Sequence, residues 1–75
     1  MNEGKEVRVR VRTIHATYTG ELFVPAMRNR FSDVINDPGS VFINLTRVHV
    51  EGDSSQIAHL SLNKYLIESI RSLEE

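Results

Sequence analysis

The sequence predicts a small, mainly β fold: a strongly bent antiparallel barrel of four or five strands, with one short helical turn and a C-terminal α-helix. Three observations lead to this prediction. Apolar and polar residues alternate with a period of two in several stretches, which is the pattern of half-buried strands. The alternation changes phase inside the longest stretch, residues 41–50, as it does at a bulge. The last segment instead places its apolar residues at helical spacing.

The phase change within residues 41–50 organises the predicted fold. The apolar residues of the first half share one face, and those of the second half fall on the other face unless an extra residue is inserted. They are Val41, Ile43 and Leu45, then Val48 and Val50. A bulge near Thr46 and Arg47 would turn both sets inward. A strand bent in this way pairs with different neighbours through its two halves, so a small sheet curls into a barrel.

Two alternating stretches precede this strand. In residues 7–14 the valines are expected to face the core and the arginines to face outward. Residues 18–24 contain Gly20, and a glycine within a strand indicates a bulge or the close approach of another backbone. The same alternation leaves Phe23 on the outer face, where we expect the C-terminal helix to cover it.

The remaining segments complete the predicted fold. Residues 31–36 are expected to form one helical turn with Ser32 as its cap. Residues 56–62 alternate again and return as a strand. Asn63 is a favourable N-cap for a helix over residues 63–73, because the apolar residues that follow it form one stripe. These apolar residues are Leu66, Ile70 and Leu73.

Length and composition restrict the class of protein. The 75 residues are expected to form one domain over residues 1–75, and there is no cysteine for a disulfide or a thiolate metal site. No run of about eighteen apolar residues and no signal-peptide pattern is present, so we expect a cytoplasmic protein without a membrane segment. The formal net charge of −1 argues against a general nucleic-acid binder.

A row of outward arginines is the first candidate binding surface. Arg8, Arg10 and Arg12 would form a basic stripe about 14 Å long, facing phosphates or an acidic partner. The alternative is a solvated strand face, with arginines paired to Glu21 or Glu6. We favour this alternative because the aromatic platforms typical of single-strand binders are missing.

The segment between the second and third strands is the second candidate surface, since binding residues often lie on loops that a rigid scaffold displays. Its candidate residues are Arg28, Arg30, Ser32, Asp33 and Asn36. The alternative, which we favour, is structural: the apolar residues of the turn plug an open end of the barrel while its polar residues satisfy backbone groups.

No pattern predicts catalysis, a cofactor or a metal. A nucleophile elbow and a glycine-rich phosphate loop are both absent, so we do not expect an enzyme. His49 and His59 would face each other across a hairpin if a three-residue turn were centred on Ser54. No carboxylate spacing supports a metal at this pair, and a change of register by one residue would separate the two rings.

The order of elements from Val7 onward resembles a family of small bacterial domains without an established activity, with the signature R-[LF]-S-D-x-[LI]-N. The matching stretch here is Arg-Phe-Ser-Asp-Val-Ile-Asn, residues 30–36. The resemblance covers nearly the whole chain. It implies that Arg30, Ser32, Asp33 and Asn36 act as one unit.

The chain also resembles the SH3-like and Sm-like barrels. Gly20, Asp33 and Asn36 follow the order of the first Sm motif, with the last two one residue closer than in that motif. Where Sm proteins place Arg-Gly, this chain has Glu51 and Gly52, which removes a cation expected near RNA. The resemblance therefore implies a bent barrel more than RNA binding.

The function that we expect is that of a non-catalytic interaction module. It would bind an unknown protein partner, or form a homo-oligomer, through exposed strand edges. The alternative is Sm-like binding of nucleic acid through the outward arginines.

Overall fold

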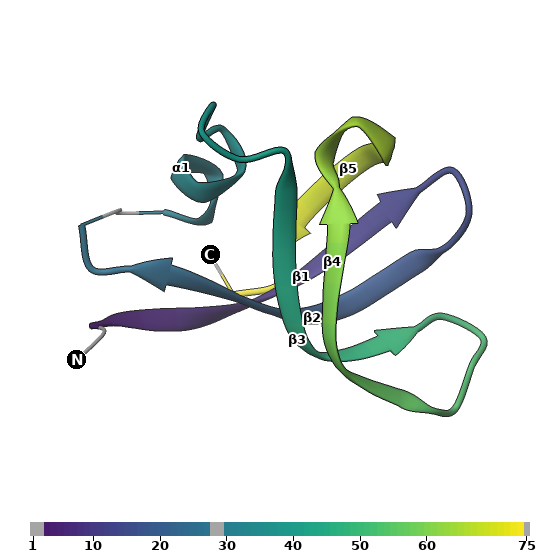
Figure 1. Ribbon diagram of the computed structural model, residues 1–75. Helices are drawn as coiled ribbons and strands as arrows, with labels where there is room; N and C mark the ends of the chain where they lie inside the picture. Colours follow the sequence, from purple (N-terminus) through teal and green to yellow (C-terminus); the bar gives the residue numbers. More distant parts are fainter. Residues whose placement is uncertain (1–2, 28–29, 75) are drawn as a thin grey trace.

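The computed structural model describes residues 3–27 and 30–74. The elements in chain order are β1 (Gly4–Thr13), β2 (Thr17–Pro25), α1 (Phe31–Ile35), β3 (Phe42–Val50), β4 (Gln56–Asn63), the 3-10 helix η1 (Lys64–Leu66) and β5 (Ile67–Ser72). Within these residues, five strands form one antiparallel sheet in the order β4-β3-β2-β1-β5 (Figure 1). The predictions of a mainly β, antiparallel fold and of a helical turn after β2 are confirmed.

A bulge in β3 lies at the predicted position. Thr19 pairs with His49, but Glu21 pairs with Thr46, so β3 has one more residue than β2 between these two pairs. The extra residue is accommodated at Arg47, whose φ of 52° is in the left-handed region. The prediction of a bulge near Thr46 and Arg47 is therefore confirmed.

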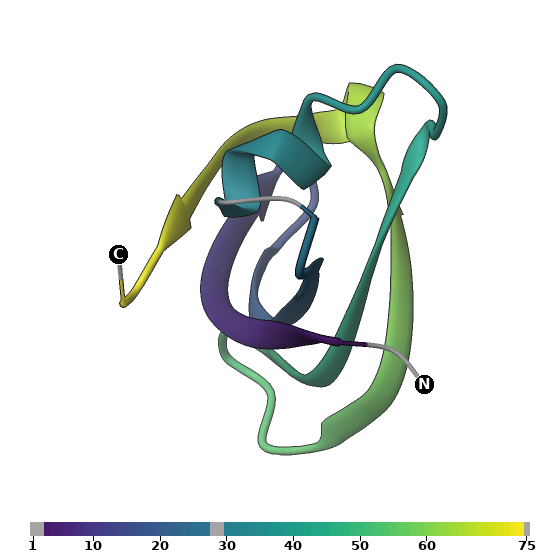
Figure 2. The same cartoon turned by 90° about the vertical axis from the view of Figure 1, so that its left-hand side faces the viewer.

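The core consists of aliphatic side chains from both sides of this bulge. The buried residues come from β1, β2 and β3, and are Val7, Val9, Val11, Leu22, Val24, Ile43, Leu45 and Val48. The valines of β1 face inward, as predicted. The apolar residues of α1 pack against the core from one end of the curled sheet (Figures 1 and 2).

Gly20 is buried in β2 at the point where β3 bulges. A Cβ atom on Gly20 would lie 3.0 Å from Cγ2 of Val48 and 3.1 Å from the carbonyl oxygen of Thr46. The second contact is with backbone, so there is little room for a side chain. The predicted close approach of another backbone at Gly20 is confirmed.

The prediction of a closed barrel is wrong. β4 and β5 lie at opposite ends of the strand order, and no pairing joins them in residues 3–27 and 30–74. Closure would require β5 to bond to β1 on one side and to β4 on the other. The bend in β3 curls the sheet, as the view in Figure 2 shows, but within the described residues β5 pairs only with β1.

The predicted C-terminal α-helix over residues 63–73 is also wrong. Asn63 does act as a cap, because its Oδ1 accepts a hydrogen bond of 2.9 Å from the N–H of Tyr65. The helix that it caps is the three-residue η1, however, and the chain then continues as β5.

Pairing with β1 explains why the helical pattern fails. Ile67 pairs with Thr13 and Ile70 with Val11, and the register shifts between these two pairs. The irregularity turns Ile67 and Ile70, three residues apart, toward the core. Of the stripe that predicted a helix, Leu66 and Leu73 lie outside β5 and are exposed. β5 supplies backbone partners to the outer edge of β1, and this pairing outweighs the local helical preference. Without the expected helix, Phe23 remains 39% exposed.

Candidate functional site

The three arginines of β1 lie on the outer face of the sheet, as predicted. Arg8 is half-buried, whereas Arg10 and Arg12 are exposed. Their charges are neutralised to different degrees. Arg8 lies 3.8 Å from Glu21, and Arg12 lies 3.4 Å from Glu68 on β5. Ion pairs this exposed contribute little to stability, although each partly neutralises the charge of its arginine.

Glu21 belongs to an ion-pair cluster that fixes the bulge. Arg47 donates hydrogen bonds of 2.7 Å to Glu21 and 2.6 Å to Glu6. The cluster therefore connects β1, β2 and β3 on the outer face. The hydrogen bond from Arg47 is the main reason that the pKa of Glu21 is lowered below its ordinary value.

Replacing Arg47 by glutamine should lower the melting temperature at neutral pH and low salt, because Glu21 and Glu6 lose their cation. The folded state lowers the pKa of Glu21, so this stabilisation is present above its unfolded pKa and is lost as pH falls through the folded value. We therefore expect the difference between wild type and Arg47→Gln to close on acidification, and to narrow in about 1 M NaCl. Thermal melts followed by circular dichroism measure both effects.

Arg10→Gln is the matched control for this variant, because Arg10 has no ion pair with any residue in the described part of the chain. It should lower the melting temperature under none of these conditions. An Arg47→Gln deficit that stayed constant with both pH and salt would show that the cluster does not stabilise the bulge electrostatically.

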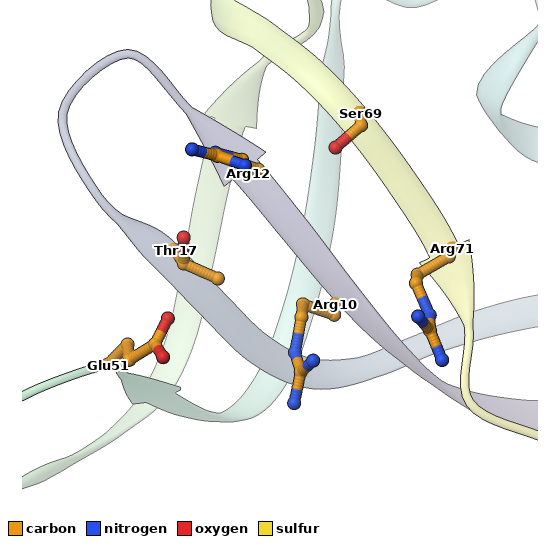
Figure 3. Close-up of a pocket in the computed structure, with 6 residues that line it drawn as sticks. All are labelled: Arg10, Arg12, Thr17, Glu51, Ser69 and Arg71. Atoms are coloured by element: carbon orange, nitrogen blue, oxygen red, sulfur yellow. The ribbon is translucent and has the colours of Figure 1, made fainter.

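A groove lies on the outer face of the sheet, beside Arg10 and Arg12 of β1 (Figure 3). We call it the arginine groove. Its volume is about 420 Å³. Its lining residues come from β1, β2, β5 and the turn after β3, and are Arg10, Arg12, Thr17, Glu51, Ser69 and Arg71. All six are polar, and three are cationic, so the groove has the chemistry of an anion site.

Two cations face each other across strands in this groove. Arg10 pairs directly with Arg71 in the β1–β5 register. Neither side chain has an acidic partner among residues 3–27 and 30–74. Figure 3 shows both guanidinium groups extending to the same side, whereas Arg12 extends toward the β1–β2 turn. Like charges directly opposite each other in a sheet are destabilising, so the pair is unfavourable without an anion.

The second candidate surface, the segment between β2 and β3, contains the short helix α1 with its capping residues. The N–H of Arg30 donates to Oδ2 of Asp33 at 3.1 Å, and the N–H of Asn36 donates to the carbonyl of Ser32 at 2.9 Å. Arg30, and not the predicted Ser32, is the N-cap, because Asp33 reaches back to its N–H. These contacts support the structural interpretation of the turn. Arg28 lies outside the described residues.

His49 and His59 do not face each other. His49 pairs with Gln56 and His59 pairs with Thr46, so the rings are three residues out of register. The reason is a wider turn, in which Gly52 has a φ of 89° and Asp53 accepts hydrogen bonds from Ser55. In the described part of the chain, no group of three or more metal-ligating side chains comes together.

Within residues 3–27 and 30–74, no helix has the length and apolar character needed to cross a bilayer.

Comparisons with known proteins found no match, so the interpretation of the site depends on its geometry alone. No protein-family model, curated protein or solved structure matches the chain.

Sequence reasoning identifies two of the six residues that line the arginine groove, Arg10 and Arg12. Ser69 and Arg71 lie within residues 63–73, for which the sequence predicts a helix. Ser69 and Arg71 alternate with Ile70, and this short alternation was the signal that could have placed both residues on an outward strand face. Glu51 and Thr17 meet at one end of the β2–β3 pair, where the N–H of Glu51 donates to the carbonyl of Thr17 at 2.8 Å, and no local pattern indicates this contact.

Proposed function

We propose that this chain is a non-catalytic interaction module that joins another polypeptide, a protein partner or a second copy, through the free edge of β4. The observation that carries the proposal is the open sheet. β4 bonds to β3 on one side, and no strand within the described residues lies on its other side. A free edge presents a row of backbone N–H and C=O groups, to which a further strand can bond.

The β4 edge lacks the devices that usually protect a free strand. Residues 56–63 contain no charged side chain and no proline, whereas the β5 edge carries Glu68 and Arg71. Ile57, Leu60 and Leu62 are only half-buried, although they face the core side of the sheet. A strand added beyond β4 would cover these side chains further, which favours pairing.

Exposed apolar side chains lie close to the same edge. Phe42 pairs with Asn63, and the N–H of Lys64 donates to the carbonyl of Val41 at 2.8 Å, so the start of β3 adjoins η1. The large apolar residues exposed there are Val41 (46%), Phe42 (48%), Tyr65 (83%) and Leu66 (44%). Such a group of residues beside a free strand is typical of an interaction surface.

We infer that the fold of this chain is an open-sheet relative of the SH3-like and Sm-like barrels. The bulge at Arg47 supports it, because one bent strand, β3, pairs with β2 on one side and β4 on the other while the sheet curls. The missing β4–β5 pairing leaves the edge through which a partner would bind.

Ser61→Lys tests the proposal, because Ser61 is exposed on β4 and an added lysine is a common protection of strand edges. Wild-type protein should show a mass above that of the monomer at high concentration, or retain specific proteins from an extract. In either assay Ser61→Lys should weaken association about fivefold, which corresponds to roughly 1 kcal/mol. Sedimentation velocity and quantitative pull-down measure the two forms of association.

Asn44→Lys is the matched control. Asn44 is exposed and pairs directly with Ser61, but it lies one strand inside the edge. The control should associate like the wild type. A strictly monomeric wild type that retains no protein specifically would refute the proposal, and so would equal losses in the two variants.

Nucleic-acid binding through the outward arginines is the second candidate function. The arginine groove supports it, since Arg10 and Arg12 both line it. The pairing of Arg8 with Glu21 shortens the basic stripe, and no aromatic residue lines the groove as a base platform. Titration with single-stranded DNA or RNA in about 50 mM salt, where phosphate contacts are strongest, tests this candidate.

A further inference from the structure

The unbalanced cations of the arginine groove point to a ligand. Arg10 and Arg71 are directly opposed across β1 and β5, without an acidic partner in the described part of the chain. An anion bound between them would convert a repulsive pair into two favourable contacts. We propose that the groove binds the phosphate group of a small, hydroxyl-bearing molecule, such as a sugar phosphate or a nucleotide.

The side chains around this pair suit a phosphate group. Each guanidinium offers a fork of N–H donors that matches the oxygens of a phosphate. Arg10 and Arg71 are paired in the β1–β5 register, and Figure 3 shows their side chains extending in the same direction, so both forks face the space where we place the anion. The hydroxyl groups of Thr17 and Ser69 line the same groove, on the side away from the two guanidinium groups in Figure 3, where they can bond to the part of the ligand beyond its phosphate.

The extent of the groove favours a small ligand over a polymer. Its volume of about 420 Å³ falls within the range of small-molecule sites. The basic surface ends on one side at Arg8, which lies 3.8 Å from Glu21. On the other side, Arg12 already has Glu68 at 3.4 Å. Free positive charge is therefore concentrated at Arg10 and Arg71, and does not continue as a track along the sheet.

Glu51 indicates what accompanies the phosphate. Its carboxylate lies on the β2 side of the groove, next to Thr17, as Figure 3 shows. An ionised carboxylate repels a second anion and accepts hydrogen bonds only. It would therefore select a ligand whose phosphate is followed by donors such as sugar hydroxyls. This site does not depend on the β4 edge, so either proposal can fail alone.

Backbone amide chemical shifts, recorded at constant ionic strength, test the site with three probes. The probes are ribose 5-phosphate, inorganic phosphate and an oligothymidine of about eight nucleotides. Ribose 5-phosphate should shift the amides of Arg10, Ser69 and Arg71 in a saturable way and bind more tightly than inorganic phosphate. It should also raise the melting temperature, since it binds the folded state.

Variants separate the roles of the residues. Arg71→Gln should weaken ribose 5-phosphate binding about tenfold or more, because a charge-assisted hydrogen bond is lost. The matched control Arg8→Gln lies on the same face outside the groove and should leave the affinity unchanged. Glu51→Gln should keep binding of inorganic phosphate but lose the preference for ribose 5-phosphate.

Two results would overturn the inference. The first is the absence of saturable shifts in the groove with ribose 5-phosphate. The second is binding of the oligonucleotide alone, which would assign the arginines to nucleic acid. Equal affinities for ribose 5-phosphate and inorganic phosphate would refute selection by Glu51. Circular dichroism should find the free Arg71→Gln protein folded and no less stable than the wild type, because the variant removes a like-charge pair.

Discussion

Replacing Leu45 by alanine is expected to lower the free energy of unfolding by about 2–5 kcal/mol. Leu45 is 0% exposed and belongs to the core cluster, so the variant loses apolar contacts and leaves a cavity. It lies on β3 just before the bulge, between β2 and β4, where it pairs with Leu22 and Leu60. Domains of this size have a free energy of unfolding of only a few kcal/mol, so a large fraction of the Leu45→Ala protein should be unfolded at 37 °C.

Urea denaturation followed by circular dichroism measures this loss, with Leu66→Ala as the control. Leu66 is the same residue type but is 44% exposed on η1. The control should cost about 1 kcal/mol, because a residue that stays 44% exposed is only partly removed from water on folding. A Leu45→Ala loss no larger than that of the control would show that the first half of β3 does not face the core.

Replacing Gly20 by valine is expected to lower the free energy of unfolding by about 1–3 kcal/mol through overpacking. Even a Cβ atom would lie 3.1 Å from the carbonyl oxygen of Thr46, and the two methyl groups of valine need more space. The obstacle is backbone at the bulge, so it cannot move aside as a flexible side chain would. The expected decrease in melting temperature is about 4–8 °C per kcal/mol for a domain of this size.

Thr19→Val is the control for this prediction. Thr19 precedes Gly20 on β2, and its side chain is not buried in the core. Valine has nearly the shape of threonine, so the control should change stability by less than about 0.5 kcal/mol. If Gly20→Val melted like the control, β3 would have to lie farther from β2 than the structure places it.

The β sheet could be predicted from the sequence because its signals are local. Alternation in residues 7–14 places the valines of β1 inward. The phase change within residues 41–50 locates the bulge, and Gly20 marks the place where β3 approaches closely. Each of these features is visible within a single strand. These local features agree with one another, because apolar residues that change face within one strand can all be buried only if the strand bulges at the point of change.

The C-terminal segment could not be predicted in the same way, because its structure depends on a distant strand. The spacing of Leu66, Ile70 and Leu73 fits a helix. In the structure, Ile67 and Ile70 pack against the core instead, across an irregular register with β1. The choice is made by the free edge of β1, whose backbone groups need partners. The prediction of a closed barrel failed for a related reason. The bend in β3 could be predicted from residues 41–50, but whether β4 and β5 pair is decided between segments at opposite ends of the strand order.

The candidate sites show the same division. The outward direction of Arg10 and Arg12 followed from alternation within β1. Their opposition to Arg71 depends on the β1–β5 register and was not visible. The proposed pairing of His49 and His59 failed because the width of the turn after β3 sets the register of the whole hairpin.

The pairing of β5, the last described strand, with β1, the first strand, has a consequence for folding during synthesis. Ser72 pairs with Val9, and the N–H of Leu73 donates to the carbonyl of Arg8 at 2.8 Å. The hairpins β1–β2 and β3–β4 can form as the chain leaves the ribosome, but contacts over such long sequence separations form late. Until β5 has emerged, β1 is an edge strand of the nascent sheet, and its unpaired backbone groups make premature contacts with other chains possible.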